Sequence, residues 1–269
     1  MLKRTTGYLA GRGCDTPRLD AEILLAHVLG VERIALYTDH ERPLTTAETD
    51  AYRAAVARRG AREPVAYIVG RRGFRRLDLA VSSAVLVPRP ETELLVEWAI
   101  EVAPPGAAVL DWGTGSGAVA LALADERPDL VVTGIDRSAD ALDLARANDR
   151  DRCTEWMLSD GFAALTDRQF DIVVANPPYL ADHELATAEP ELSFEPSGAL
   201  TSGPSGYEAV ELITRETPGH LRSGGWLLAE VGIGQAERVA QLYRVAGFGD
   251  VEVRPDLAGI PRVVGGRLT

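Results

Sequence analysis

Hydrophobic residues in the first part of the chain recur at the spacing of amphipathic helices. In the segment 17–29 the recurring positions are Leu19, Ile23, Ala26 and Leu29 or Val28. Gly30 follows this segment as a helix stop. Thr45 and Glu48 have the spacing of a capping box, which predicts a second helix through about Arg59. We therefore expect residues 1–65 to form a small helical domain.

The pattern changes after Pro64. Short apolar pieces at 66–69, 77–81 and 84–87 are separated by glycine and arginine. Runs of this length and composition are typical of extended strands. We expect residues 66–89 to form a β-hairpin that links two domains.

From Pro90 onward, buried strands alternate with helices. Pro90 at a first helical position, with Glu91 and Glu93 in the first turn, predicts a helix start. The expected strands are 107–112, 130–135, 154–158, 170–175, 225–231, 251–254 and 262–268, and the expected helices include 118–125, 139–147, 207–221 and 235–246. This alternation predicts an α/β domain over residues 90–269, with a largely parallel sheet covered on both faces. Such sheets bind ligands at the carboxyl ends of their strands.

The composition is that of an ordinary globular protein. The chain has 269 residues, of which 46% are hydrophobic and 25% charged, and this length favours two domains. No apolar run approaches the roughly 20 residues that span a bilayer, and the first residues lack the pattern of a secretion signal, so we expect a cytoplasmic protein with no membrane contact. Cys14 and Cys153 are far apart, which disfavours a disulfide framework and a structural metal site.

Charge is unevenly distributed along the chain. Residues 1–90 hold 15 Lys and Arg against 10 Asp and Glu, whereas residues 91–269 hold 13 against 30, which gives net charges of +5 and −17. Nonspecific binding to a nucleic-acid backbone requires a positive field. The larger segment is therefore a poor candidate for that role.

A glycine-rich loop is the first chemical signal. It comprises Gly113, Thr114, Gly115, Ser116 and Gly117 and lies between a predicted strand and a predicted helix. Asp136 ends the next strand, where a carboxylate can accept hydrogen bonds from both hydroxyls of a ribose. The loop fits the dinucleotide fingerprint, and it also fits the denser pattern that encloses the amino-acid part of S-adenosylmethionine. The loop alone does not choose between these cofactors.

The segment Asn176-Pro177-Pro178-Tyr179 follows the predicted strand 170–175 and decides the interpretation. An amide or aromatic amine is a poor nucleophile because its lone pair is delocalised. The side-chain oxygen of Asn176 and the carbonyl oxygen of Pro177, aimed at its two hydrogens, would bind more tightly as positive charge grows on the nitrogen. The prolines fix the backbone without offering a competing N–H group, and Tyr179 can pack on the planar amide.

With these motifs the chain resembles the release-factor glutamine methyltransferases, which methylate the glutamine amide of the Gly-Gly-Gln motif in peptide chain release factors. The resemblance runs nearly end to end and includes segments 18–27, 63–67, 87–93 and 224–232. It implies a Rossmann-like class I fold with a seven-stranded, mostly parallel sheet. It also implies an S-adenosylmethionine site at Gly113–Gly117 and Asp136, a glutamine site at Asn176–Tyr179, and contact of Asn176 with both ligands.

One position departs from the family pattern. After Ser159 and Asp160 many members have Trp-Phe, where this chain has Gly161 and Phe162. The resemblance implies that Asp160, Gly161 and Phe162 lie at the cofactor. Phe162 or a neighbouring apolar side chain is then expected to replace the missing tryptophan beside the adenine ring, or else cofactor affinity is lower.

The helical domain is expected to hold the substrate protein. Eight arginines lie between Arg53 and Arg76, and they would suit acidic patches on a release factor. An alternative is a solvated helix face followed by a basic hairpin. Our expectation is a monomer with no direct binding to nucleic acid.

Three further functions compete with glutamine methylation. Adenine N6-methylation of nucleic acid also suits Asn-Pro-Pro-aromatic, because the motif would grip a flipped-out exocyclic amine; the acidic segment 91–269 and the lack of a large target-recognition domain count against it. A nicotinamide oxidoreductase would use the glycine loop but leaves Asn176–Tyr179 unexplained. A non-catalytic cofactor-binding protein would explain Gly161.

Overall fold

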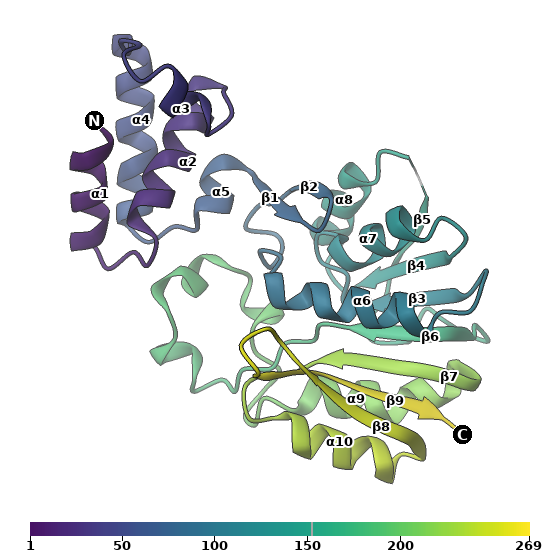
Figure 1. Cartoon of the computed structure of the whole chain (residues 1–269). Helices are drawn as coiled ribbons and strands as arrows, with labels where there is room; N and C mark the ends of the chain where they lie inside the picture. Colours follow the sequence, from purple (N-terminus) through teal and green to yellow (C-terminus); the bar gives the residue numbers. More distant parts are fainter. Residues whose placement is uncertain (152) are drawn as a thin grey trace. The chain divides into compact units, whose positions relative to one another are not determined.

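The computed structural model describes residues 1–151 and 153–269. Two compact units divide the chain, the first formed by Met1–Arg71 with Glu189–Phe194 and the second by Arg72–Ala188 with Glu195–Thr269 (Figure 1). The first division falls inside the region 66–89 that the sequence predicts to be a linker. The short segment Glu189–Phe194 belongs to the first unit although its neighbours in sequence belong to the second.

The first unit is helical. Its helices are α1 (Leu2–Gly11), α2 (Pro17–Leu29), α3 (Ala35–Thr38), α4 (Thr46–Gly60) and α5 (Val65–Val69), and its part of the inserted segment is the 3-10 helix η3 (Pro190–Phe194). The predicted capping box is confirmed, because Thr45 and Glu48 exchange hydrogen bonds at the start of α4. Gly30 ends α2 in the left-handed conformation, as the sequence predicts.

The predicted buried face of α2 is wrong in part. Leu19 is 38% exposed, whereas Leu24 and Leu25 are buried. These two leucines pack with Tyr52 of α4 and Ile68 of α5. Several apolar stripes are available on so hydrophobic a helix, and contacts with α4 and α5 select the one that is buried.

The region 66–89 contains a hairpin, as predicted, but only the predicted piece 77–81 corresponds to one of its strands. Residues 66–69 are not extended but belong to α5, which begins after Pro64 and ends at the left-handed Gly70. The strands of the hairpin are β1 (Arg71–Phe74) and β2 (Leu77–Ala80), and residues 84–87 form no strand. The β-branched residues of α5 mimic a strand, but proline before the segment and glycine after it define a short helix.

The second unit is built on a seven-stranded sheet. Its strands are β3 (Ala108–Trp112), β4 (Val131–Asp136), β5 (Thr154–Leu158), β6 (Phe170–Ala175), β7 (Leu221–Glu230), β8 (Phe248–Pro255) and β9 (Pro261–Leu268). They lie in the order β5-β4-β3-β6-β7-β9-β8. The pairs from β5 through β7 are parallel, and β9 is antiparallel to both β7 and β8. This arrangement confirms the predicted α/β fold.

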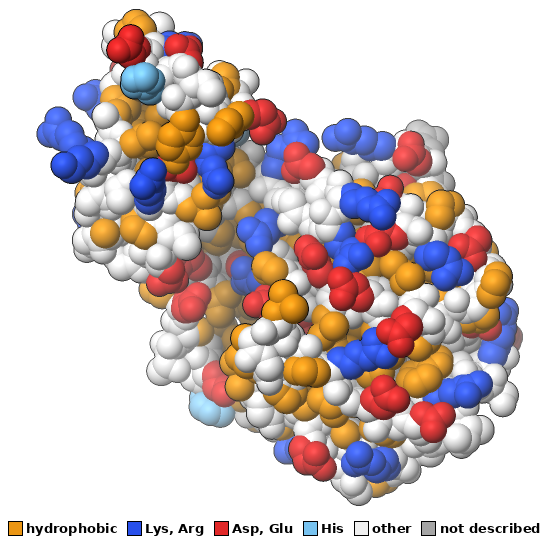
Figure 2. Space-filling model, viewed as in Figure 1, with side chains coloured by type: hydrophobic (Ala, Val, Ile, Leu, Met, Phe, Trp, Pro, Cys, Tyr) orange, Lys and Arg blue, Asp and Glu red, His pale blue; other side chains and the backbone are white. Residues whose placement is uncertain are grey.

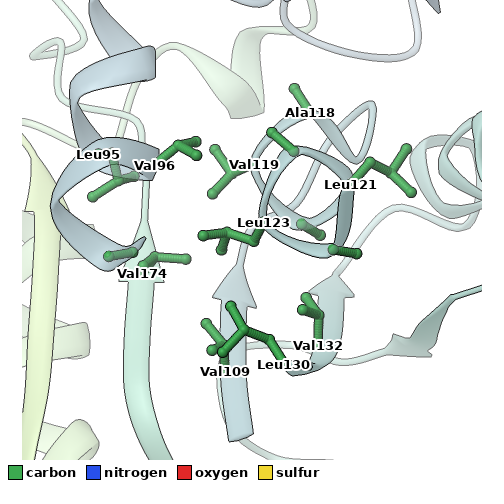
Figure 3. Packing of buried hydrophobic residues seen from close by; sticks show 14 of the residues in the cluster. Leu95, Val96, Val109, Ala118, Val119, Leu121, Leu123, Leu130, Val132 and Val174 are labelled. Carbon is green, nitrogen blue, oxygen red and sulfur yellow. The ribbon is translucent and has the colours of Figure 1, made fainter. Parts of the chain in front are cut away.

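Helices cover both faces of the sheet. On one face α6 (Glu93–Val102) and α7 (Ala118–Glu126) form an apolar core with the strands, and Figure 3 shows this packing around Leu95, Val96, Val119, Leu123, Val109, Val132 and Val174. On the other face α9 (Glu208–Glu216) and α10 (Ala236–Val245) bury Val210, Ile213 and Val239 against Val173 and Leu227. The helix α8 (Ala139–Asn148) joins β4 to β5. The two apolar clusters fill the space between the sheet and these helices.

Two predicted helices have different ends. The helix predicted over 207–221 ends at Glu216, continues as the 3-10 helix η5 (Thr217–Gly219), and gives way to β7 at Leu221. Pro218 lacks an N–H group and prevents α9 from continuing. The helix predicted at Pro90 begins as the 3-10 helix η1 (Pro90–Thr92) and continues as α6. The remaining 3-10 helices are η2 (Leu185–Thr187) and η4 (Ser197–Ala199). Among all the helices described, none is long and apolar enough to cross a bilayer.

Candidate active site

The sheet register brings the predicted motifs to one edge. Trp112 on β3 pairs with Ile135 on β4 and with Ala175 on β6, and Ala175 pairs with Ala229 on β7. Each of these four residues is followed directly by a polar or glycine residue: Asp136, Gly113, Asn176 and Glu230. Because the four strands are parallel, these positions lie side by side at their carboxyl ends. The chain reverses its order between β3 and β6, which is where such sheets bind ligands.

The glycine loop after β3 has a backbone that requires glycine. Gly113, Gly115 and Gly117 have φ of +71°, +54° and +82°, which side chains rarely adopt. A Cβ atom at Gly117 would lie 2.9 Å from the Trp156 ring, whereas positions 113 and 115 face open space. Gly117 therefore serves packing at the start of α7, and the first two glycines leave room for a ligand.

The carboxylate of Asp111 fixes the glycine loop through hydrogen bonds. It accepts hydrogen bonds from Oγ1 of Thr114 at 2.6 Å and from the N–H of Ala120 at 3.1 Å. The side chain is only 2% exposed, and this burial raises the pKa of Asp111 to about 6. Sequence reasoning did not name Asp111 as a site residue, although its place two residues before the glycine loop, at the end of a buried strand, was a signal.

Asp136 lies where the predicted ribose contact requires a carboxylate. Its Oδ2 accepts a hydrogen bond from the N–H of Gly115, and its Oδ1 accepts one from the N–H of Ser138, each at 2.9 Å. These bonds fix the carboxylate beside the glycine loop and leave acceptor positions on both oxygens.

A pocket of about 520 Å³ joins the loop to Asp136 and Asn176. This volume is within the range of small-molecule sites. The predicted residues that line it are Gly113, Thr114, Gly115, Ser116, Asp136, Asp160, Gly161, Asn176 and Pro178. Gly117, Phe162, Pro177 and Tyr179 are not among its lining residues.

The structure corrects the expectation for Phe162. Its ring is buried and stacks on His220, with ring centroids 4.8 Å apart. The apolar wall near Gly161 comes instead from Ala209 and Leu212 of α9, which line the pocket. A neighbouring apolar side chain, the second option raised by the sequence, is therefore available beside Gly161. Sequence reasoning could not find Leu212, because it belongs to α9 and is remote from Gly161 along the chain.

A second segment closes the pocket from the opposite side. Residues 195–202 contribute Pro196, Gly198, Ala199, Thr201 and Ser202 to the lining. Glu195 anchors this segment, because its carboxylate accepts hydrogen bonds from Arg89 at 2.6 Å and from the N–H of Val87 at 3.2 Å. The sequence offered no signal for this closure.

The side-chain amide of Asn176 has a hydrogen-bond partner at its nitrogen but none at its oxygen among the described residues. Its Nδ2 donates a hydrogen bond of 3.1 Å to Oγ1 of Thr92. Its Oδ1 is buried and has no hydrogen-bond partner within the described part of the chain. An unpaired buried acceptor is costly, and because Asn176 lines the pocket, its Oδ1 is available to a donor on a bound ligand.

The Asn-Pro-Pro-Tyr segment is held by the loop between β7 and α10. The carbonyl oxygen of Tyr179 accepts a hydrogen bond of 2.9 Å from Nε2 of Gln235. Oε1 of Gln235 in turn accepts one of 2.9 Å from the N–H of Gly232. Burial raises the pKa of Tyr179, and the charge of Glu230 raises it further. The phenol is therefore a neutral group.

The site fits S-adenosylmethionine. The glycine loop offers open backbone at positions 113 and 115, Asp136 offers a carboxylate for the ribose, and Ala209 and Leu212 offer an apolar wall for a base. Asn176 lies at the same pocket with an acceptor to spare. Such an acceptor suits an amide or amine –NH2 group that attacks a carbon within the pocket.

Comparison with known proteins agrees with this geometry. Residues 1–70 match the PrmC N-terminal domain family and residues 90–196 match the methyltransferase small domain family. The release factor glutamine methyltransferase of Geobacter sulfurreducens is 43% identical over 271 residues, covering 100% of this chain and 95% of the relative. That of Burkholderia pseudomallei is 46% identical over 270 residues, covering 96% of this chain and 94% of the relative.

A solved structure supports the fold. The 16S rRNA N2 G1207 methyltransferase of T. thermophilus, in complex with AdoMet and guanosine, is 21% identical with a TM-score of 0.53, covering 74% of this chain and 50% of that one. The sheet order, the glycine loop and these matches define a class I methyltransferase that uses S-adenosylmethionine. The chain belongs to the release factor glutamine methyltransferase family, which confirms the resemblance seen in the sequence.

Proposed function

We propose that this protein transfers a methyl group from S-adenosylmethionine to the side-chain amide nitrogen of the glutamine in the Gly-Gly-Gln motif of peptide chain release factors. The observation that carries the proposal is the buried and unpaired Oδ1 of Asn176, which lines the cofactor pocket. Relatives at 43% and 46% identity bear the name of this activity. Membership of the family and the unpaired Oδ1 of Asn176 both support methylation of an amide nitrogen.

Asn176 and Pro177 act on the nucleophile. S-adenosylmethionine supplies an electrophilic methyl group when it is bound. Oδ1 of Asn176 and the carbonyl oxygen of Pro177 accept hydrogen bonds from the two amide hydrogens of the substrate glutamine. Both bonds strengthen as the nitrogen becomes positive, so the two residues stabilise the transition state more than the ground state.

The rest of the segment positions the amide. Pro177 and Pro178 fix the backbone, and the bond from Gln235 to the carbonyl oxygen of Tyr179 holds the end of the segment. The Tyr179 ring packs on the planar amide in this proposal. Holding the reacting atoms in line supplies much of the rate.

The decisive experiment compares two acceptors. The protein is incubated with methyl-labelled cofactor and either a release factor or adenine-containing DNA. Mass spectrometry of the peptide that contains Gly-Gly-Gln should show one added methyl group on the glutamine, and a release factor with glutamate at that position should stay unmodified. Label in DNA alone would overturn the proposal and favour adenine methylation.

We also propose that the enzyme acts as a cytoplasmic monomer without direct contact to nucleic acid. The acidic excess of residues 91–269, a net charge of −17, supports the last point. On the face shown in Figure 2, basic and acidic side chains are interspersed over the strand-containing unit. Light scattering and a salt-dependent DNA-binding assay test these expectations. A stable dimer or tight binding to DNA at moderate salt would contradict them.

A further inference from the structure

Beside Asn176, Thr92 and Glu230 form a buried polar cluster that the proposed reaction leaves unexplained, and Thr92 lines the same pocket as Asn176. Thr92 is 4% exposed and ends η1, and Glu230 is 3% exposed and ends β7. Register places Glu230 beside Asn176, because each follows one member of the Ala175–Ala229 pair. Thr92 reaches Asn176 from 84 residues away in the sequence, through the 3.1 Å bond.

Counting hydrogen-bond donors and acceptors determines which atom donates and which accepts among Asn176, Thr92 and Glu230. Ionised Glu230 can only accept hydrogen bonds, and the Thr92 hydroxyl has a single hydrogen to donate. Thr92 lowers the pKa of Glu230, which is the effect of a hydroxyl hydrogen oriented toward a carboxylate. Oε2 of this carboxylate has no hydrogen-bond partner among the described residues, so it is available as an acceptor. When the hydroxyl hydrogen of Thr92 is directed to Glu230, the hydroxyl oxygen can only accept a hydrogen bond from Asn176. The amide of Asn176 must then turn its nitrogen, the donor, toward Thr92. Oδ1 is then the end left for the substrate, as the unpaired atom shows.

We propose that Thr92 and Glu230 are positioning residues that fix the amide orientation of Asn176, so that its oxygen rather than its nitrogen meets the glutamine amide. The catalytic role that we assign to these two residues rests on the proposed function. The orientation of the Asn176 amide is supported independently by the Asn176–Thr92 hydrogen bond and by the strand register. A reversed amide would present two donors to the two hydrogens of the substrate and would repel them.

The surroundings of Glu230 make this orientation depend on pH. Burial raises the pKa of Glu230 to about 7, the charge of Glu91 raises it further, and Thr92, Arg262 and Arg89 lower it. Tyr179 also faces this carboxyl group. Protonated Glu230 can donate to Thr92, and the Thr92 hydrogen is then free to turn toward Asn176. We expect kcat to fall as the pH drops below about 7, since the acceptor-only form of Glu230 is lost.

The test uses two substitutions at Thr92 and a matched control. Thr92→Val keeps the shape and removes the hydroxyl, whereas Thr92→Ser retains it. We expect T92V to lower kcat about 10- to 100-fold, with KM and cofactor affinity within about threefold, and T92S to stay within about threefold of wild type. Thr214→Val removes another buried hydroxyl, which donates to the carbonyl oxygen of Val210 at 2.7 Å, and should leave kcat unchanged.

A readout without substrate separates this inference from the proposed function. In NMR spectra of the protein alone, the side-chain NH2 of Asn176 should exchange slowly with solvent in wild type and T92S and faster in T92V. Glu230→Gln should lower kcat and abolish its decline below pH 7. Slow exchange or full kcat in folded T92V would overturn the positioning role. Failure of the wild-type protein to methylate any release factor would overturn the proposed function instead, and would leave the exchange result standing.

Discussion

The guanidinium group of Arg137 donates a hydrogen bond of 2.8 Å to the carbonyl oxygen of Gly198, and both residues line the cofactor pocket. Arg137 follows Asp136 at the end of β4, and Gly198 lies in the segment 195–202. The bond therefore joins the two sides of the pocket. Closure of the pocket depends on it and on the anchor that Glu195 forms with Arg89.

Removing the Arg137 side chain should open this closure. We expect Arg137→Ala to weaken binding of S-adenosylmethionine about 3- to 10-fold, the value of one hydrogen bond at an exposed site. Isothermal titration calorimetry measures the change. Arg146→Ala is the control, because Arg146 pairs with Asp143 on its own helix at 2.9 Å, away from the pocket lining. Equal affinities for the two variants would contradict the closure.

Gly113 and Gly106 form a matched pair for testing the glycine loop. Their φ angles are +71° and +70°, and at both residues the position that a Cβ would take is free of other atoms within 4 Å. Substitution by alanine should cost each variant about 1 kcal/mol of stability. Only Gly113→Ala places a methyl group in the pocket, so we expect only that variant to lose more than about tenfold in cofactor affinity. Similar losses in both variants would point to unfolding rather than to the loop.

Asn176→Ala tests the central acceptor. We expect kcat/KM for release factor methylation to fall about 10²- to 10³-fold, as for loss of one preorganised hydrogen-bonding group. The free energy of unfolding should fall by only about 1 kcal/mol, because one hydrogen bond is lost, from Nδ2 to Thr92, whereas the lost Oδ1 has no partner among the described residues. Steady-state kinetics with a labelled cofactor gives the answer. Wild-type kcat in this variant would remove Asn176 from the mechanism.

The buried carboxyl group of Glu230 should reduce stability at high pH. Its pKa in the folded protein is raised from 4.5 to about 7, so between these values the folded state binds more protons than the unfolded state. The free energy of unfolding therefore falls as pH rises through this window. Glu230→Gln never ionises, and we expect it to be up to about 3 kcal/mol more stable than wild type at pH 8 and nearly equal at pH 4.5. Urea unfolding at both pH values checks this, and a gain independent of pH would refute the assignment.

Arg59 is the buried cation of the helical unit. It forms ion pairs with Asp20 at 2.7 Å and with Glu191 at 2.8 Å, and it is 6% exposed. We expect Arg59→Met to cost about 3–5 kcal/mol, because it leaves the buried carboxylate of Asp20 without its cation and leaves Glu191 with Arg62 alone. Arg53, paired with Asp50 on the surface, should change stability by less than about 1 kcal/mol when replaced by alanine. Chemical unfolding curves compare the two.

Burial and periodicity make much of the fold predictable. The strands predicted at 154–158 and 170–175 have the ends that the structure shows. For 170–175 this follows because a buried apolar run bounded by polar residues has few alternatives, whereas 154–158 is a partly exposed edge strand. The prediction for the segment 66–69 is wrong, because four residues carry too little periodicity to outweigh their β-branched composition. The predicted domain boundaries at 65 and 89 stay predictions.

The site is predictable where its residues are contiguous. The glycine loop, Asp136 and Asn176 each follow a strand, so the sequence places them at one edge. In the sequence Thr92 is only part of a predicted helix start. Its role could not be predicted, because its contact with Asn176 joins residues 84 positions apart. The arginines between 53 and 76 suggest either a substrate clamp or a solvated face. Arg58, Arg59, Arg62 and Arg75 instead form ion pairs within their own units, and contact with a release factor stays a prediction.

The inserted segment Glu189–Phe194 determines how this protein can be divided. Glu191 accepts hydrogen bonds from both Arg59 and Arg62 of the helical unit, yet it lies between stretches of the methyltransferase unit in sequence. A fragment that stops near residue 71 would keep Asp20 but lack Glu191, the second carboxylate paired with its buried guanidinium. The helical unit is therefore not a detachable module, and exchanging it between relatives would require a second graft at residues 189–194.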